Sequence, residues 1–333
     1  MSGLITNALR RFFALESAGG FVLVIAASFA LIMANSPFSH QYENFLKPAH
    51  GFINEGLMSI FFFLVGLEIR REFVQGEFQN RKAAALPVIA ALGGMVTPAL
   101  IYLLFNAGRS GANGWAVPMP TDIALALGAL ALLGSRIDTS LKIFLLTLAI
   151  ADDLGSIIVL AIFYSDGLSF IKIAATIGAI VLAWIIPTGK TISLDALIQA
   201  IHPWATFVVI PLFALANVGL RIDFNSLPDL ITSPVTYGII ISRVVGKLVG
   251  ITLFAWISVR IGIAQLPNSL TFKEISGAAA LAGMGLTVSL FIADLAFAGG
   301  EVLNGIKLGL IVSAFISALI GLSILRKYSS AQD

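Results

Sequence analysis

The stretch 141–164, LKIFLLTLAIADDLGSIIVLAIFY, decides the fold of this chain. A helix needs about 20 mostly apolar residues to cross a bilayer, and only Asp152 and Asp153 carry charge between the ends of this stretch. An ionised side chain at the bilayer centre costs at least about 2.5 kcal/mol, and such acids face a bundle interior or a wet cavity, where they bind cations or relay protons. The pattern therefore predicts a spanning helix with an ion-binding pair of carboxylates. The alternative is a pair that is salt-bridged to Lys or Arg of a neighbouring helix for structural reasons.

The composition of the whole chain is that of an integral membrane protein. Of its 333 residues, 58% are hydrophobic and 11% are charged, whereas soluble domains carry about 25% charged residues. A net charge of +2 with scattered Lys and Arg excludes a nucleic-acid partner. The absence of cysteine excludes disulfides and thiolate metal sites. We expect an all-α polytopic membrane protein in contact with lipid, without a cofactor and without enzymatic activity.

Ten membrane spans are expected from the hydropathy. They are 17–35, 52–69, 83–105, 115–133, 141–164, 170–187, 201–219, 235–258, 275–297 and 303–325. Cytoplasmic loops of membrane proteins carry an excess of Lys and Arg. Loops on the side of the termini contain Arg70, Arg71, Arg81, Lys82, Arg136, Lys142, Lys190, Arg260 and Lys273, and the opposite loops contain only Lys47, Arg109, Lys172 and Arg221. Both termini are therefore predicted to be cytoplasmic.

Two of the expected spans contain helix breakers. Pro118 and Pro120 precede Thr121 and Asp122 in the span 115–133, and proline removes a backbone donor and clashes with the preceding turn. In the span 275–297, the sequence AGMGLTVSLF places two glycines in the middle of the membrane. Glycine alone often only permits close helix packing. Interruptions at corresponding places in two halves, however, point to the binding site of a transporter.

The two interruptions fall in the middle members of two triplets of spans. The first triplet is 83–164 and the second is 235–325, and because they start on opposite sides of the membrane they predict inverted three-helix repeats with two discontinuous crossing helices. We expect one transporter domain over 1–333, in which these triplets form the core. The spans in 17–69 and 170–219 are then scaffold or interface.

The remaining charges in the expected spans lie near these features. Asp122 sits at a helix break, where it can offset the positive end of a half-helix. Lys247 lies in the middle of its span, where it can offset carbonyl ends or pair with Asp152 or Asp153, and Arg243 lies one turn before it on the same face. Adjacent residues point about 100° apart on a helix, so the two aspartates have different surroundings. Which of them meets a cation stays open at this stage.

Five motifs resemble the NhaA family of sodium/proton antiporters, in the family's order and over nearly the whole chain. They are GLEIRREFVQG (66–76), PTDIALALGALALLGSR (120–136), LAIADDLGSIIV (148–159), HPWATFVVIPLFALAN (202–217) and GMGLTVSLFIADLAF (283–297). The resemblance implies a protein of the bacterial inner membrane. It also implies that the transported ions are Na⁺ or Li⁺ and H⁺.

The resemblance also implies a role for each matching residue. Asp152 and Asp153 form the cation and proton site, with Asp153 the direct sodium ligand, and Thr121 and Asp122 belong to the crossing of the broken helices. Lys247 pairs with an aspartate and loses this partner when sodium binds. A further lysine and a cluster linked to pH regulation complete the set: Lys307, Glu68, Arg71 and Glu72. From the residues themselves, an ordinary solvated helix end explains that cluster equally well.

Three departures from the family pattern stand out. The region 171–191 is too short for the three helices expected there, so the chain has about ten spans where the family has twelve. The loop 35–51 lacks the extended hairpin that some members use in homodimers. Arg243 occupies a usually apolar position, no proline follows Lys247, and Gln199 and Ala200 replace polar or charged residues of the regulatory cluster.

The function expected from these observations is exchange by competition. Burial and like-charge repulsion favour proton uptake by an aspartate pair, which titrates as a coupled unit, and a proton and a sodium ion cannot neutralise the same carboxylate together. The alternatives are a passive cation channel and a shortened homologue without transport activity. An intramembrane aspartyl protease is disfavoured because its chemistry does not need adjacent acids.

Overall fold

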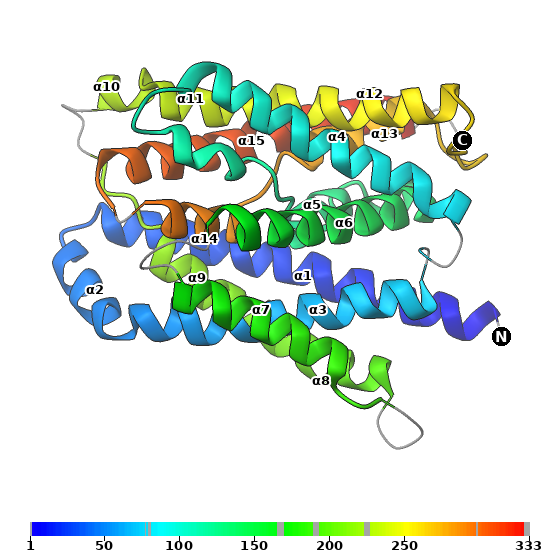
Figure 1. The fold of residues 1–333 in the computed structure, drawn as a ribbon, viewed down its shortest axis with the longest axis horizontal. Coiled ribbons are helices and arrows are strands. Elements are labelled where there is room, and N and C mark those ends of the chain that lie inside the picture. The colour runs from blue at the N-terminus through cyan, green and yellow to red at the C-terminus, as the bar shows by residue number, and fades with distance from the viewer. Residues whose placement is uncertain are drawn as a thin grey trace.

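A computed structural model of the chain describes residues 2–76, 78, 81–164, 170–188, 193–222, 227–297 and 299–329. These residues form helices and connecting segments without a strand, and the long helices run along the long axis of the molecule (Figure 1). Both termini lie at the same end, which we call the terminal end (Figure 1). The helices are α1 (Ser2–Ala34), α2 (Ser39–Leu46), α3 (Met58–Gln75), α4 (Arg81–Asn106), α5 (Ile123–Ala131), α6 (Thr139–Phe163), α7 (Phe170–Ile185), α8 (Leu194–Trp204), α9 (Ile210–Asn217), α10 (Leu227–Ile231), α11 (Pro234–Ile241), α12 (Lys247–Arg260), α13 (Phe272–Leu281), α14 (Thr287–Ala296) and α15 (Glu301–Ser329).

Seven helical segments among the described residues are long and apolar enough to cross a membrane. They are Ala14–Ala34, Phe52–Gln75, Ala84–Asn106, Thr139–Phe163, Leu194–Asn217, Pro234–Arg260 and Glu301–Tyr328. Three of them contain a π-helical segment: Phe52–Leu57, Ala205–Val209 and Ser242–Gly246. These seven correspond to seven of the ten expected spans. The prediction of an all-α polytopic membrane protein is confirmed.

The other three expected spans are short or divided helices. The span 170–187 is α7, and the spans 115–133 and 275–297 are each interrupted. A 3₁₀ turn, Ala112–Ala116, is followed by a non-helical segment and then α5, while α13 and α14 are separated by residues 282–286. Both interruptions lie where the sequence places its prolines and its paired glycines.

The helices α4 and α12 touch through their backbones. A Cβ atom added to Gly93 would lie 2.3 Å from the carbonyl oxygen of Gly250, and one added to Gly250 would lie 2.2 Å from that of Gly93. Such a close approach requires glycine on both helices. It links the first helices of the two predicted triplets in a reciprocal way, as a two-fold relation between inverted repeats would. The division of the chain into repeats and scaffold itself stays a prediction.

The remaining helices pack around these triplets. Helix α1 lies against α5 and α9, and α3 lies against α7 and α8 (Figure 1). Gly20 of α1 permits the first of these contacts, since its Cβ would lie 2.1 Å from the carbonyl oxygen of Ala124. The interrupted helix α5 is therefore held between α6 and a helix from outside its own triplet.

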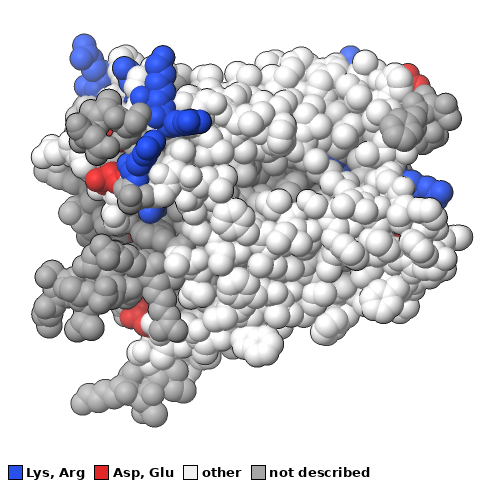
Figure 2. Space-filling model, turned by 180° about the vertical axis from the view of Figure 1, so that it is seen from behind, with Lys and Arg blue, Asp and Glu red and all other residues white. Residues whose placement is uncertain are grey.

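Charged side chains avoid the middle of the molecular surface. Lys and Arg gather mainly at the terminal end, which is on the left in Figure 2, and a broad zone almost without charged side chains lies beside it. Large apolar side chains such as Ile25, Leu104 and Phe315 are more than half exposed. An uncharged belt with exposed apolar residues is the surface that lipid requires. The side chains of Arg81, Lys82 and Lys172, and all of Lys190, lie outside the described residues.

Candidate ion-binding site

Two unwound segments meet in the middle of the bundle. The backbone N–H of Asp122, at the end of the segment before α5, donates a hydrogen bond to the carbonyl oxygen of Met284, in the segment before α14 (3.1 Å). Pro118 and Pro120 favour the first segment, because each proline lacks a backbone donor and clashes with the preceding helical turn. Unwound backbone at this depth is tolerated only where it is buried in protein or lines a cavity. We call this junction the crossing.

Asp122 lies between the starts of two helices. Its Oδ1 accepts a hydrogen bond from the N–H of Leu125 in α5 (3.3 Å). Its Oδ2 accepts one from the hydroxyl of Thr287, the first residue of α14 (3.0 Å), and lies 3.5 Å from the N–H of the same residue. The side chain is buried. One carboxylate thus faces the positive N-terminal ends of both α5 and α14.

Asp152 forms a closed group with Thr121 and Lys247. The ammonium of Lys247 donates to Oδ2 of Asp152 (2.7 Å) and to the hydroxyl oxygen of Thr121 (3.0 Å), and this hydroxyl donates to the same carboxylate oxygen (2.6 Å). Asp152 and Lys247 are both fully buried. The structure therefore answers the question that the sequence left open: Lys247 pairs with Asp152.

Asp153 has different surroundings, as the helical rotation between neighbours requires. It is half-buried. Its Oδ1 is shielded from solvent and has no hydrogen-bond partner among the described residues. A carboxylate oxygen without a partner is costly to bury, and it is free to accept a proton or a cation. The salt-bridge alternative thus describes Asp152 and not Asp153.

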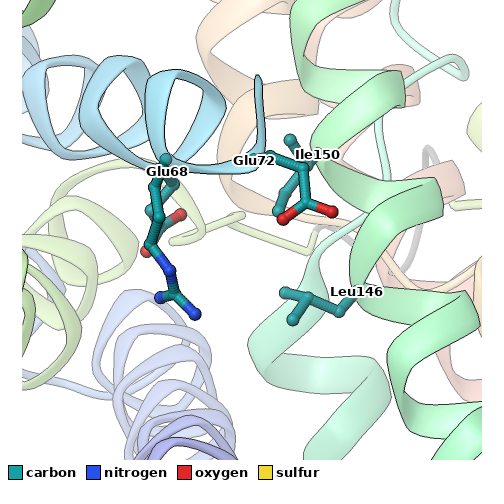
Figure 3. A pocket seen from close by; sticks show the side chains of 5 residues that line it. Glu68, Glu72, Leu146 and Ile150 are labelled. Carbon is teal, nitrogen blue, oxygen red and sulfur yellow. The ribbon is translucent and has the colours of Figure 1, made fainter. Parts of the chain in front are cut away.

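A pocket opens between α3 and α6, toward the terminal end from the aspartates. It is lined by Glu68, Arg71, Glu72, Leu146 and Ile150 (Figure 3). Leu146 and Ile150 lie seven and three residues before Asp153, so all three share one face of α6. The pocket therefore lies along the helix face that leads to Asp153.

Arg243 is a buried charge whose contacts the sequence did not predict. It lies in the π-helical turn before Lys247 and is fully enclosed. Its guanidinium donates to the carbonyl oxygens of Gly283 (3.0 Å), Pro120 (3.1 Å) and Val117 (3.4 Å), and to the hydroxyl of Ser289 (2.8 Å). The three carbonyls belong to the two unwound segments.

Comparison with known proteins places this arrangement in a family. The family model described as Na⁺/H⁺ antiporter 1 matches residues 10–174 and 171–325. The chain belongs to the Na⁺/H⁺ antiporter 1 family. The Na⁺/H⁺ antiporter NhaA of Yersinia enterocolitica is 40% identical to it over an alignment of 382 residues that covers 97% of each chain. The NhaA of Yersinia pestis is 39% identical over the same extent.

The chain is shorter than these NhaA relatives. The alignment of 382 residues exceeds the length of the chain, 333 residues, so the relatives carry residues that this chain lacks. The two segments matched by the family model meet at 171–174, at the start of α7. Among the described residues, α7 is the one helix between α6 and α8. The chain is thus shortened at the place where the sequence predicted missing helices, and all elements of the crossing are retained.

The residues that resemble the family's regulatory cluster are not a simple solvated helix end. Glu72 is 9% exposed and Glu68 is half-buried. Arg71 forms an ion pair with Asp195 of α8 (3.6 Å). Together with the pocket, these contacts make the cluster a junction between α3, α6 and α8.

Sequence reasoning missed a second buried acid close to this cluster. Glu16 of α1 contacts His202 of α8, and ligand atoms of Glu16, Glu68 and His202 all lie within 4.8 Å of one another. Glu16 is the single acidic residue of the helical segment Ala14–Ala34, and the expected span 17–35 began one residue after it. A lone acid in a span is itself a signal of function.

Lys307 lies apart from the crossing. It is half-buried on α15 and its charge interacts with Asp294 of α14. No hydrogen bond or ion pair within the described part of the chain joins it to Asp152 or Asp153. The structure therefore brings together Thr121, Asp122, Asp152, Asp153 and Lys247, and it leaves Lys307 outside this group.

Proposed function

We propose that the chain exchanges Na⁺ or Li⁺ for H⁺ across a membrane, with both ions competing for Asp152 and Asp153. The observation that carries the proposal is the asymmetry of the pair. Oδ2 of Asp152 is paired with a buried lysine, whereas no ion pair to Asp153 is present among the described residues, and Oδ1 of each aspartate is buried there without a hydrogen-bond partner. Such an arrangement favours uptake of a small cation or of protons.

The ligands for a small hard cation are close to one another. Oxygen ligands suit such ions, and Asp153, Asp152, the hydroxyl of Thr121 and the unwound carbonyls of the crossing supply them. A cation that takes Asp152 as a ligand competes with Lys247 for the charge of this carboxylate. Lys247 then loses its partner, and a proton released from it would make the exchange electrogenic.

Access to the site is proposed to alternate between the two ends of the molecule. The pocket beside Glu68 and Glu72 leads toward Asp153 from the terminal end. At the opposite end, Asn54 before α3 donates to Asp294 of α14 (3.3 Å) and to Asn217 of α9 (3.1 Å), and Asn217 donates back to Asn54 (2.7 Å). The bond from Asn54 to Asp294 joins the predicted scaffold to the predicted core, and the bonds between Asn54 and Asn217 lie within the predicted scaffold. Movement of 83–164 and 235–325 against 17–69 and 170–219 would open one end as it closes the other.

The terminal end is proposed to face the cytoplasm of a bacterial cell, with the protein in the inner membrane. The concentration of Lys and Arg at this end (Figure 2) supports that orientation. Cytoplasmic sodium would then enter by the pocket, and external protons would enter from the other side. Membrane lipid is the proposed partner. No cofactor, no nucleic acid and no covalent chemistry take part in this scheme.

Regulation by pH is proposed for the charged cluster that lines the pocket. Glu68, Arg71 and Glu72 lie beside Glu16 and His202, and histidine is the side chain that titrates nearest to neutral pH. A change of charge there would act on α1, α3 and α8 at the mouth of the pocket. A homodimer stays a prediction, and the described residues between α1 and α3 form a helix, α2, in place of a hairpin.

The test is transport by the purified chain in proteoliposomes that contain a pH-sensitive dye. Adding Na⁺ or Li⁺ should produce saturable proton flux in the opposite direction. A passive channel would instead conduct cations without saturation and without coupled proton movement. A shortened homologue without transport activity would give neither signal.

A further inference from the structure

Four helix ends meet at the crossing, and two buried charged side chains, Asp122 and Arg243, compensate their partial charges. The N-terminal ends of α5 and α14 are positive and face Asp122, as described above. The opposite ends, the last turn before 117 and the end of α13, present carbonyl oxygens. Val117 and Gly283 follow these two ends, and their carbonyl oxygens accept hydrogen bonds from Arg243, as does the carbonyl oxygen of Pro120 in the unwound segment before α5. The crossing thus has one fixed anion and one fixed cation.

Lys247 makes a different set of contacts. Its ammonium donates to Asp152 and Thr121, and no hydrogen bond from it to a carbonyl oxygen is present among the described residues. The two cations on this helix, one turn apart, therefore serve different partners. From the sequence alone, Lys247 was one of the groups expected to offset carbonyl ends.

We infer that Arg243 is a positioning residue of the cation site, because its guanidinium holds the carbonyl ends of the crossing and leaves Lys247 free to exchange Asp152 for a cation. This inference rests on the proposed function. Arginine suits the task, because its planar fork presents five donors and stays protonated in proteins. The crossing then keeps its shape when Lys247 changes partner or loses a proton.

The space for the guanidinium is provided by one glycine. A Cβ atom at Gly285 would lie 2.1 Å from Nη2 of Arg243, 3.1 Å from its Cζ and 3.0 Å from the backbone oxygen of Pro120. Gly283 is two residues away, but its Cβ would meet the hydroxyl of Ser317 (2.3 Å) and the backbone oxygen of Arg243 (2.9 Å). The tightest contact of a Cβ atom at Gly285 is therefore with the Arg243 side chain. The contacts of a Cβ atom at Gly283 are with groups that a substitution of this side chain leaves in place.

The fixed charge also acts on the ions that enter the site. The charge of Arg243 interacts with both Asp122 and Asp152, so it opposes a second cation at the aspartate pair. Removing it should strengthen sodium binding while the poorly held crossing slows transport. Loss of folded protein alone would lower the maximal rate and leave the half-saturating sodium concentration unchanged.

The first experiment is a double-mutant cycle read by thermal unfolding of the purified full chain in detergent. Gly285→Ala should lower the Tm of the unmodified chain and should lower it much less in the Arg243→Leu background. Gly283→Ala, the matched control, should cost the same in both backgrounds. If Arg243→Leu does not fold, Arg243→Gln takes its place. Equal costs of Gly285→Ala in both backgrounds would overturn the inference.

The second experiment compares Arg243→Gln and Arg243→Lys in proteoliposomes at alkaline pH, where protons compete least. For Arg243→Gln we expect the half-saturating Na⁺ concentration to fall by about three- to tenfold and the maximal rate to fall as well. Arg243→Lys should return the half-saturating concentration toward the original value. An unchanged or raised value in Arg243→Gln would contradict the inference. Absence of exchange in the unmodified chain would refute the proposed function. The double-mutant cycle would still test the contact between Arg243 and Gly285.

Discussion

The ammonium of Lys247 lies 2.7 Å from Oδ2 of Asp152, and both side chains are fully buried. This ion pair joins α6 to α12 in the middle of the bundle, beside the crossing of the two interrupted helices. Removing one partner of an ion pair that has no access to water is costly, because the charge of the other partner stays buried without compensation. Whenever no cation occupies the site, the buried charge on α6 therefore depends on the one on α12 for its neutralisation, and the reverse holds as well.

A test of this dependence uses both partners. Asp152→Asn leaves the ammonium of Lys247 buried without an anion, and we expect it to lower the free energy of unfolding by about 3–5 kcal/mol. Lys247→Met should cost a similar amount. The combined variant should be more stable than the sum of the two losses predicts, because neither charge is left alone. The measurement is thermal or denaturant unfolding in detergent, and additive losses would show that the two residues do not pair.

The backbone contact between α4 and α12 gives a second prediction. Gly250→Ala introduces a methyl group 2.2 Å from the carbonyl oxygen of Gly93 and 2.8 Å from the Thr97 side chain, so the helices must separate. We expect the Tm to fall by several degrees, because overpacking costs about 1–3 kcal/mol.

The matched control is Gly178→Ala in α7. A Cβ atom there meets nothing within 4 Å, and alanine favours a helix more than glycine does. Its Tm should be unchanged or slightly raised. A loss of equal size in both variants would mean that the effect of Gly250→Ala is unrelated to α4.

The pocket can be probed with single cysteines, because the chain contains none of its own. Leu146 lines the pocket, whereas Leu148, two residues further along α6, is fully buried. Leu146→Cys should react with a membrane-impermeant maleimide in everted vesicles, in which the cytoplasmic face is outside. Leu148→Cys should stay unreactive under the same conditions. Reaction of Leu146→Cys only in right-side-out vesicles would reverse the proposed orientation.

The bonds at the far end of the bundle give a prediction about access. Asn217 exchanges hydrogen bonds with Asn54, which also donates to Asp294. Asn54→Ala removes the bond to Asp294, which joins the predicted scaffold to the predicted core, and should favour the state that is open at that end. Labelling of Leu146→Cys from the cytoplasmic face should then slow down at least severalfold. Unchanged labelling would show that these bonds do not control access.

Much of the site follows from the sequence because its signals are local. Asp152 and Asp153 are conspicuous in an apolar stretch, and the closely spaced pairs Pro118–Pro120 and Gly283–Gly285 mark the two interruptions, whereas the single Pro87 and Pro98 lie inside α4. Both interruptions were therefore predicted at the right places. The sequence predicted that Lys247 could pair with Asp152 or Asp153 but left the choice open, because it depends on the rotation of α6 relative to α12, and no local pattern encodes that angle.

Other contacts were beyond local reasoning for the same reason. Glu16 and His202 lie far apart in the chain and meet only because α1 and α8 are neighbours. Arg243 was placed on the correct helix face, but its carbonyl partners come from two segments that the sequence marks only as unwound. Lys307 was assigned by resemblance, and it lies beside Asp294 and away from the aspartate pair.

The measurement that tests the central claim most directly is sodium-driven proton flux in proteoliposomes at several pH values, for the unmodified chain and for Asp153→Asn. If one proton and Na⁺ compete for the pair, raising the pH removes the competing proton. In the acidic part of the range, the half-saturating Na⁺ concentration of the unmodified chain should then fall by about tenfold for each unit by which the pH rises. Asp153→Asn, which keeps the volume of the side chain and loses its charge, should show no exchange at any pH. Saturable exchange that survives in Asp153→Asn, or a half-saturating concentration that does not change with pH, would contradict the account.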